Sequence, residues 1–195
     1  LIATGSHRRK LDIPGVKEFD AKGIAYCASC DAPLFSNQDT AVIGGGNAAF
    51  EAVAQLAAYA KSVTLLHRRD KFKADPVTIE LASKNPKVKI ITNAVPVEIK
   101  GDQFVTALVY EDKNENKTVE LPVTGIFIEI GLLPTTYFAE TAGVEMNSIK
   151  QILEKWQEIK EKLLNERPNK FQIKAVKGIV TFVKLSQNRY RTVYK

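Results

Sequence analysis

The sequence contains few cysteines and histidines, the residues that form most zinc sites. Its 195 residues include two cysteines, Cys27 and Cys30, and two histidines, His7 and His67. A structural zinc site uses four ligands, and a catalytic zinc site uses three ligands and a water molecule, at characteristic spacings. The two histidines stand at no such spacing from the cysteine pair. We therefore expect no metal site in this chain.

Long apolar runs are also missing from the sequence. No run approaches the roughly 18 residues that indicate a membrane-spanning helix, and the opening LIATGSHRRK lacks the apolar centre of a secretion signal. These features predict a cytoplasmic protein that does not contact a membrane. In that compartment a pair of cysteines indicates redox or metal chemistry rather than a structural disulfide.

Acidic residues are scarce in the last quarter of the chain. Residues 1–145 contain 16 Lys and Arg against 18 Asp and Glu, whereas residues 146–195 contain 12 against 4. This shift indicates a possible boundary near residue 146. The apolar spacing beyond it predicts a helix over 148–166, and the alternation of apolar and basic residues predicts a β-hairpin over 171–195. We expect the basic residues of this region to form a solvated face, with nucleic-acid binding as the alternative.

The middle of the chain predicts an α/β fold. The run TAVI (40–43) leads into the glycine turn GGGN (44–47), an alanine-rich helix (47–60) and the run VTLLH (63–67). Together they form one strand–helix–strand unit. We expect a further helix around 75–84. The predicted fold is a Rossmann-like domain of three layers, with a parallel sheet and an antiparallel β-excursion. The strands expected after that helix are 88–92, 104–111, 117–123 and 125–131, with a hairpin loop at 112–117.

The glycine turn has the spacing of a dinucleotide-binding motif. Gly44, Gly46 and Ala49 satisfy G-x-G-x-x-A between a strand and a helix. The first glycine permits the tight turn, the second lets the backbone approach a pyrophosphate, and the small third residue packs the helix on the strand. The helix N-terminus then faces the negative charge. The pattern is weak alone, but its place in a strand–helix–strand unit predicts a dinucleotide site.

The residues after the next strand predict which dinucleotide binds. A site for NAD has Asp or Glu there to hold the ribose 2′-hydroxyl, whereas this chain has His67, Arg68, Arg69 and Lys73. A guanidinium pairs with a 2′-phosphate, and each hydrogen bond to a charged group contributes about 1.5–3 kcal/mol. The alternative is that Arg68 and Arg69 form a solvated charge run. We expect the site to bind NADPH, with His67 beside the phosphate.

The cysteine pair itself allows three interpretations: half of a zinc site, a thioredoxin-type centre, or a disulfide that exchanges electrons with a cofactor. The ligand count opposes zinc. A thioredoxin fold would place Cys27 and Cys30 at the start of a long helix, but Pro33 follows closely and a strand begins by Thr40. A dithiol beside an NADPH unit remains, with a thiolate favoured at this spacing. Asp31 either moves a proton or forms a turn.

Four motifs together resemble a known family. YCASCDAPLF (26–35), AVIGGGNAAFEA (41–52), HRRDKFKAD (67–75) and GIFIEIGLLP (125–134) are similar to motifs in the NADPH domain of low-molecular-weight thioredoxin reductases and of the related flavoprotein subunit of alkyl hydroperoxide reductase. The opening 15 residues resemble the crossover from that family's FAD domain. The resemblance implies a crossover remnant over 1–22, an NADPH-binding domain over 23–133, and a segment over 134–195 that does not match the family.

The resemblance also implies an activity and a role for each site residue. In such enzymes NADPH reduces FAD, FAD reduces the C-x-x-C disulfide, and the dithiol reduces a thioredoxin-like or peroxiredoxin-type protein disulfide. Cys30 would face the flavin, Cys27 would attack the partner, and Asp31 would act as acid and base. The implied cofactor-binding residues are Gly44, Gly45, Gly46, Asn47 and Ala48 for the pyrophosphate, Arg68, Arg69 and Lys73 for the 2′-phosphate, Ile130 and Gly131 near the nicotinamide, and Thr4 and Gly5 for FAD.

One expected feature of the family is missing from these residues. A flavin needs its own glycine fingerprint, but the 11 glycines contain one cluster, which the NADPH site uses. We therefore expect an incomplete chain that forms a homodimer or takes its FAD domain from a partner chain. We expect residues 146–195 to be foreign to the family, with a divergent C-terminal segment as the alternative. A non-catalytic NADPH-binding module is the alternative to the reductase.

Overall fold

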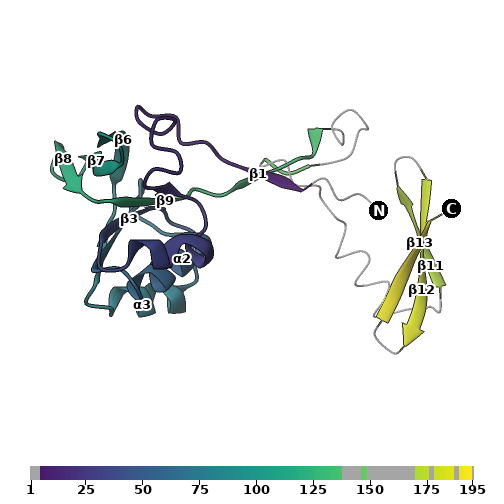
Figure 1. Cartoon of the computed structure of the whole chain (residues 1–195). Helices are drawn as coiled ribbons and strands as arrows, with labels where there is room; N and C mark the ends of the chain where they lie inside the picture. The colour runs from purple at the N-terminus through teal and green to yellow at the C-terminus, as the bar shows by residue number, and fades with distance from the viewer. Residues whose placement is uncertain (1–4, 138–145, 149–169, 176–177, 187–188, 195) are drawn as a thin grey trace. The chain divides into compact units, whose positions relative to one another are not determined.

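The computed structural model describes residues 5–137, 146–148, 170–175, 178–186 and 189–194. The chain divides into two compact units, and each is described by itself. One unit is formed by Arg8–Leu132, and the other by Leu1–His7 with Leu133–Lys195. The first unit contains the α/β fold expected from the sequence, which is thereby confirmed (Figure 1).

A five-stranded sheet, parallel throughout, lies at the centre of the Arg8–Leu132 unit. Its strands follow the order β2-β9-β3-β4-β5. The central strand β3 pairs with β9 on one side and with β4 on the other, so the direction of strand order reverses next to β3. The strands are β2 (Ile24–Ala25), β3 (Asp39–Gly44), β4 (Ser62–Leu66), β5 (Val88–Ile91) and β9 (Gly125–Glu129).

Two different layers cover the two faces of this sheet. The helices α2 (Asn47–Ala57) and α3 (Pro76–Ser83) lie on one face, and a three-stranded antiparallel sheet lies on the other (Figure 1). Successive side chains of a strand point to opposite faces, so alternate residues enter different cores. Val42 and Phe127 join the core under the helices, and Ile43, Ile126 and Ile128 join the core under the antiparallel sheet.

Helix α2 buries one face in the core of the unit. Its alanines favour helix, and Phe50, Val53 and Leu56 are fully buried. It ends at Ala57, three residues before the end predicted from the sequence. The Lys87 ammonium donates hydrogen bonds to the carbonyls of Ala57 and Ala60 at 3.2 and 3.0 Å, so the last turn is capped by a cation.

The antiparallel layer contains one strand more than the sequence predicted. The expected hairpin joins β7 (Val105–Asp112) to β8 (Lys117–Pro122). Strand β6 (Ala94–Gly101) pairs with β7 on the side away from β8. Pro96 lies in β6 next to a register shift. Proline occurs in strands at such irregular positions, and its presence lowers a sequence-based expectation of strand.

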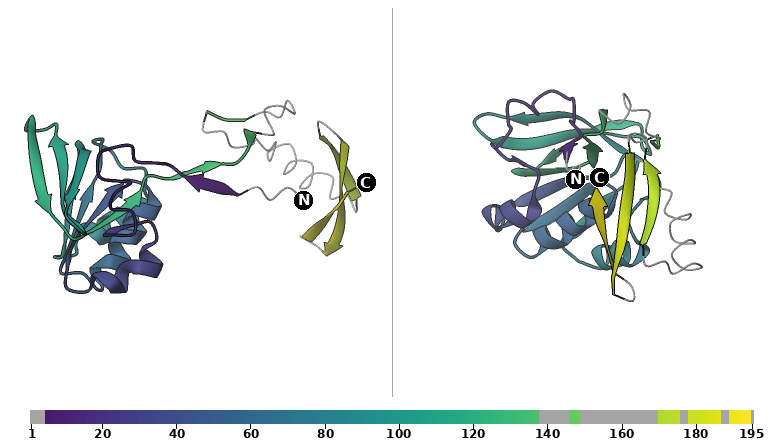
Figure 2. Two further views of the ribbon diagram at one scale, coloured as in Figure 1. Left: turned by 45° about the horizontal axis from the view of Figure 1, so that its top comes forward. Right: turned by 90° about the vertical axis from the view of Figure 1, so that its right-hand side faces the viewer.

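Two further sets of strands include residues of the second unit. Strands β1 (Ser6–Arg8) and β10 (Leu132–Pro134) pair with each other. Strands β11 (Lys170–Ala175), β12 (Gly178–Ser186) and β13 (Arg189–Tyr194) run side by side as an antiparallel sheet (yellow in Figure 2). The expected two-stranded hairpin is therefore a three-stranded sheet. The expected helix over 148–166 lies outside the described residues, except for residue 148.

Membrane insertion through a helix finds no support in the described part of the chain. None of the helices there is long and apolar enough to cross a bilayer.

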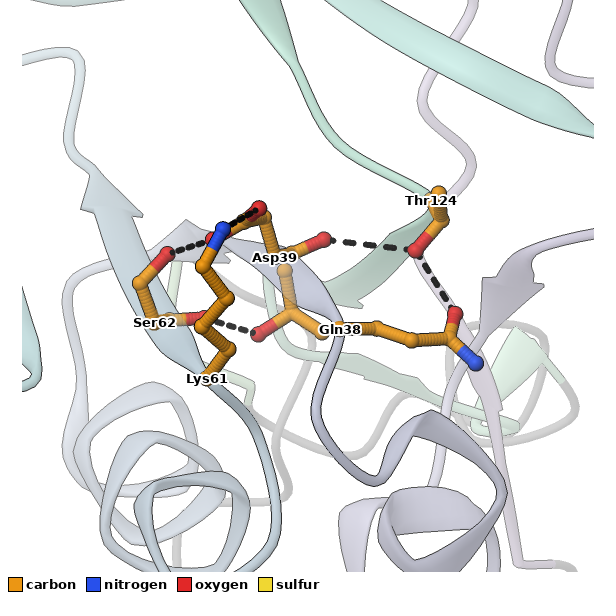
Figure 3. Close-up of polar contacts among 6 residues, drawn as sticks. Gln38, Asp39, Lys61, Ser62 and Thr124 are labelled. Atoms are coloured by element: carbon orange, nitrogen blue, oxygen red, sulfur yellow. Dashed lines mark hydrogen bonds and ion pairs between the residues drawn. The ribbon is translucent and has the colours of Figure 1, made fainter.

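A polar network ties together the strand ends opposite the expected cofactor site. The Asp39 carboxylate accepts hydrogen bonds from Ser62 Oγ at 2.6 Å and Lys61 Nζ at 2.9 Å, and Thr124 Oγ1 donates to Gln38 Oε1 at 2.7 Å (Figure 3). These residues lie at the beginnings of β3, β4 and β9, so their contacts join three adjacent strands. The bonds from Ser62 and Lys61 lower the pKa of Asp39.

We expect Asp39→Asn to lower stability at neutral pH but not in acid. A carboxylate whose pKa is depressed by folding contributes stability above its unfolded pKa, and this contribution is lost as the pH falls through the folded value. Because the side chain is partly exposed, the loss at neutral pH is at most about 1 kcal/mol. Urea unfolding at neutral pH and at a pH below about 3 measures the effect. An equal difference at both pH values would contradict it.

Candidate functional site

Four segments of the candidate site emerge at one edge of the parallel sheet. Residues after the carboxyl ends of parallel strands meet at the same edge. Cys27 follows β2, Ile130 follows β9, the glycine turn (44–46) follows β3, and the loop 67–73 follows β4. The strand order β2-β9-β3-β4 therefore places the cysteine pair, residues 129–131, the glycine turn and the basic loop in that order along the edge. This edge, where the strand order reverses, is where open α/β sheets bind ligands.

The glycine turn has one position where a side chain would collide with the protein and one position where it would not. A Cβ atom on Gly44 would lie 2.5 Å from the Glu129 carbonyl oxygen and 2.6 Å from Ala49 Cβ, so only glycine fits. A Cβ on Gly46 would meet nothing within 4 Å in the described structure. No side chain in the described part of the chain caps the N-terminus of α2, and Asn47 and Ala48 are exposed. The free helix N-terminus fits a pyrophosphate.

Asn47 uses its side chain for a structural contact. Its Nδ2 donates to Asp75 Oδ2 at 3.1 Å, and its Oδ1 accepts from the Asp75 N–H at 2.8 Å. Asp75 immediately precedes α3, so this pair joins the beginnings of the two helices. Of the polar groups of Asn47, the backbone N–H at the start of α2 is the one placed to meet a phosphate.

The basic loop after β4 is attached to the glycine turn. The Lys73 N–H donates to the Gly45 carbonyl at 2.8 Å, and the Asn93 N–H donates to the Arg69 carbonyl at 3.2 Å. The side chains of Arg68, Arg69 and Lys73 are exposed. The loop backbone is thus held in place, and its cationic groups extend into solvent beside the turn.

His67 differs from this pattern, because its side chain is turned towards the protein. Its Nδ1 lies 3.0 Å from the Gly44 carbonyl oxygen, and its Nε2 lies 3.0 Å from the Lys71 carbonyl oxygen. The ring covers the position that a side chain on Gly45 would occupy. The sequence predicts that His67 lies at the end of a strand. It does not predict the direction of the ring, which depends on contacts between loops.

Cys27 and Cys30 form a disulfide, with their Cα atoms 5.4 Å apart. Cys27 immediately precedes α1 (Ala28–Asp31), and Cys30 lies within it. Helix α1 is a single turn that continues directly into the 3₁₀ helix η1 (Ala32–Phe35). The short helix agrees with the sequence argument that Pro33 leaves no room for a thioredoxin-type helix. Cys27 is half-buried and Cys30 is exposed.

A hydrogen bond joins the cysteine turn to the helix of the glycine turn. Ser29 Oγ, between the two cysteines, donates to Gln55 Oε1 of α2 at 3.0 Å. Helix α2 begins at the glycine turn, so the same helix supports both the candidate nucleotide site and the disulfide. Neither Ser29 nor Gln55 was predicted as a site residue, and no local pattern indicates their contact.

A cavity of about 380 Å³ lies beside the disulfide, and its walls include Cys27, Asp31, Tyr26, Arg8 and Asp20. The Arg8 guanidinium lies 5.3 Å from the centre of the Tyr26 ring, within the range of a cation–π contact. Burial raises the pKa of Tyr26, and the Asp20 carboxylate raises it further. Asp31, predicted to move a proton, therefore borders the same cavity as Cys27, whereas Arg8, Tyr26 and Asp20 were not predicted.

Between the disulfide and the glycine turn lies a carboxyl group that the sequence did not single out. Glu129 ends β9 and pairs with Gly44 in the sheet register. Burial raises the pKa of Glu129, the Arg8 guanidinium opposes this shift, and Glu51 of α2 adds to it. A signal was present in the sequence, because a charged residue at the end of an apolar strand such as GIFIE is unusual.

Of the remaining predicted residues, Ile130 and Gly131 follow β9 at this edge of the sheet. Ile130 is half-buried, and Gly131 adopts a left-handed conformation and accepts a hydrogen bond from the Arg9 N–H at 3.0 Å. Gly5 belongs to the second unit, where its carbonyl accepts from the Thr135 N–H. Thr4 lies outside the described residues. In the described residues no group of three or more His, Cys, Asp or Glu side chains is placed to hold a metal ion.

The fold and the disulfide define a class of redox protein, and comparison with known proteins identifies the family. Residues 1–162 match the family model of the pyridine nucleotide-disulphide oxidoreductases. The chain belongs to this family.

Individual relatives carry related names. The chain is 42% identical over 153 residues to a subunit of alkyl hydroperoxide reductase from Staphylococcus epidermidis, and 39% identical over 153 residues to a Bacillus subtilis protein named NADH dehydrogenase. Each match covers 78% of this chain and 30% of the relative. Among solved structures, thioredoxin reductase of Lactococcus lactis matches with a TM-score of 0.70 and 39% identity, over 77% of this chain and 50% of that one.

The chain thus spans about a third of the curated relatives and half of the solved neighbour. The resemblance stated from the sequence motifs is confirmed.

Proposed function

We propose that this chain is the NADPH-binding and dithiol part of a flavoprotein disulfide reductase of the thioredoxin reductase type. This proposal rests on the order of the site segments along the carboxyl ends of the parallel strands. A basic loop, a phosphate-binding turn and a disulfide follow one another along strands β4, β3, β9 and β2. A dinucleotide bound with its 2′-phosphate at the basic loop would extend towards the disulfide.

The described residues fit NADPH. The Gly46 and Ala48 region offers the open N-terminus of α2 to the pyrophosphate, while Arg68 and Arg69 offer exposed guanidinium groups to the 2′-phosphate. Lys73 adds a third cation without the fork geometry of arginine. Residues 129–131 border the part of the edge where the nicotinamide would lie.

The described residues do not build a second dinucleotide site for FAD. Members of the family use a flavin together with the nicotinamide nucleotide, and the flavin carries electrons between the nicotinamide and a disulfide. The one glycine turn of the described α/β unit is the turn already assigned to NADPH. We propose that the FAD domain comes from sequence outside these 195 residues or from a partner chain.

The cysteine pair would reduce the disulfide of a thioredoxin-like or peroxiredoxin-type protein. A thiolate of the reduced pair attacks the partner disulfide and releases one partner thiolate. The second cysteine then attacks the mixed disulfide, so that the Cys27–Cys30 bond re-forms and the second partner thiol leaves. Asp31, which borders the cavity beside Cys27, would supply or accept the protons.

Nucleotide selectivity tests this proposal on the chain itself. We expect Arg68→Ala and Arg69→Ala each to weaken NADPH binding by about 10- to 100-fold, because each removes a hydrogen-bonding charge from the 2′-phosphate. NADH binding should change by less than about 2-fold, since NADH lacks that phosphate. Titration of NADPH and NADH fluorescence measures both affinities.

Lys89→Ala provides the control for the lost charge. Lys89 is an exposed cation on β5, away from the carboxyl edge of β3. The Lys89→Ala variant should leave the preference for NADPH over NADH unchanged. Equal losses of NADPH and NADH affinity in the arginine variants, or no preference in the unaltered chain, would contradict the NADPH assignment. A flavin absorption band in the purified chain would contradict the absence of a flavin site.

A further inference from the structure

One cation reaches the cavity beside the disulfide. Arg8 and Cys27 both line this cavity of about 380 Å³. Of the wall residues that the structure describes, Arg8 is the only basic one, whereas two carboxyl groups, those of Asp20 and Asp31, belong to the same wall. A thiolate formed at Cys27 would therefore share this space with two negative charges and one positive charge.

Backbone and ring contacts hold Arg8 beside the cysteine turn. The next residue, Arg9, donates its N–H to the carbonyl of Gly131 at 3.0 Å, so the chain at Arg8 is attached to the segment that follows β9. The Arg8 guanidinium lies 5.3 Å from the centre of the Tyr26 ring, within the range of a cation–π contact. Since Tyr26 immediately precedes Cys27, the cation is held next to the reactive turn.

The charge of Arg8 favours an anion on the residue before Cys27. Burial raises the pKa of Tyr26, and the Asp20 carboxylate raises it further. The Arg8 guanidinium opposes this rise, because a positive charge stabilises the phenolate. A thiolate one residue further along the chain would be stabilised by the same charge.

Arg8 also favours an anion on the strand beside the cysteine turn. Ala25 pairs with Phe127 in the register of β2 and β9. Cys27 and Glu129 each come two residues after this pair. Burial raises the pKa of Glu129, and the Arg8 guanidinium opposes this rise as well. The positive charge therefore acts both on the residue that precedes Cys27 and on the residue that ends the neighbouring strand.

We propose that Arg8 is a positioning residue for the reaction of Cys27: its guanidinium stabilises the Cys27 thiolate and so speeds the attack on a partner disulfide. The inference rests on the proposed dithiol reaction. The thiolate, and not the thiol, is the nucleophile in that reaction. Negative charges nearby disfavour the thiolate, and four carboxyl groups lie on the elements that adjoin the turn. They are Asp20 before β2, Asp31 in α1, Glu51 in α2 and Glu129 at the end of β9.

Alkylation by iodoacetamide tests this role without flavin, nucleotide or partner. The reagent is uncharged, so Arg8 neither attracts nor repels it, and the thiolate displaces iodide to form a carbon–sulfur bond. In a reduced chain with Cys30→Ser, Cys27 is the only thiol. We expect Arg8→Gln to slow its alkylation about 3- to 10-fold at about pH 7, where the thiolate is the minor form. The rate–pH profile should move to higher pH, and the rates should converge where the thiol is fully deprotonated.

Matched variants separate the charge from the structure. Arg8→Lys keeps the charge and should keep most of the rate, whereas Arg8→Met serves as a second neutral variant. Arg9→Gln removes a neighbouring exposed cation outside the cavity wall and should change the rate by less than about 2-fold. In the Cys27→Ser background, Arg8→Gln should have an equally small effect on Cys30, which does not line the cavity. Thermal unfolding establishes that each variant is folded.

Three results would overturn the inference. The first is an equal rate with and without Arg8 at every pH. The second is a loss of rate that persists at high pH, since it would show a change of access instead of charge. The third is an equal slowing of Cys30. Failure of the unaltered chain to bind NADPH would count against the proposed function, and it would leave the result at Arg8 unchanged, because the alkylation uses no nucleotide.

Discussion

Gly44→Ala should destabilise the α/β unit and abolish nucleotide binding. The added methyl group would lie 2.5 Å from the Glu129 carbonyl oxygen and 2.6 Å from Ala49 Cβ. The first atom belongs to the backbone of β9, and the second to the first turn of α2. Neither is the end of a flexible side chain, so relief requires the strand or the helix to move.

Such overpacking costs about 1–3 kcal/mol of unfolding free energy. The same movement displaces the N-terminus of α2, where the pyrophosphate is proposed to bind. Urea unfolding measures the first effect and NADPH fluorescence the second. We expect NADPH affinity to fall by more than about 100-fold, because both the helix N-terminus and the spacing to the basic loop are disturbed.

Gly46→Ala separates binding from stability two residues further along the same turn. A Cβ at Gly46 meets nothing within 4 Å in the described structure, and the backbone there is extended with φ −105° and ψ −177°. The variant should be as stable as the unaltered chain within about 0.5 kcal/mol. It should still bind NADPH more weakly, because the methyl group occupies the approach to the phosphates. Equal stability of Gly44→Ala and Gly46→Ala would contradict the close contacts seen at Gly44.

The strand–helix–strand unit was predictable because its signals are local. An apolar run, a glycine turn and a run of alanines specify β3, the turn and α2 without reference to the rest of the chain. Strand β2 was not predictable in this way, since its two residues, Ile24 and Ala25, are too few to show alternation. Its place beside β9 depends on packing between distant segments.

The C-terminal sheet shows how a correct local signal can predict the wrong number of turns. The alternation of apolar and basic residues over 171–195 correctly indicates strands, but the single hairpin predicted from it is wrong. Gly178 and Asn188 are two turn-forming residues ten apart, a spacing that allows three strands. The observed sheet has its strands bounded near these positions.

The sequence indicated candidate site residues but not their contacts. The motifs named the cysteines, the glycines and the basic residues, and the parallel sheet brings them to one edge. The direction of the His67 ring, the pairing of Asn47 with Asp75 and the contact of Ser29 with Gln55 each depend on two loops or helices that are far apart in sequence. Residue type alone does not determine such contacts.

Replacing either cysteine should abolish the complete reduction of a disulfide by the reduced chain. In the unaltered chain, after chemical reduction, one thiolate attacks a disulfide reagent and releases one thiol. The other cysteine, 5.4 Å away between Cα atoms, then displaces the second thiol and closes the Cys27–Cys30 bond. Mass spectrometry should therefore find the chain without an adduct and with its internal disulfide restored.

Cys27→Ser and Cys30→Ser should each stop after the first step, because no second thiol is present to resolve the mixed disulfide. Mass spectrometry should then find one reagent adduct per chain. The two variants serve as controls for each other, since each keeps one of the two sulfurs in the same turn. They should differ in rate: the Cys27→Ser variant retains the exposed Cys30 and should react faster than the Cys30→Ser variant, whose remaining cysteine is half-buried.

The rate difference distinguishes this chain from the complete reductase that the resemblance implies. There Cys30 would face the flavin and Cys27 would attack the partner, so access to Cys30 would depend on the flavin domain. In this chain Cys30 is the more exposed residue of the pair. A faster reaction of Cys27 would mean that the cavity beside it, with Asp31 and Tyr26 in its wall, activates that thiol enough to outweigh its burial. A persistent adduct on the unaltered chain would contradict the two-cysteine reaction, because it would show that the second sulfur does not reach the first.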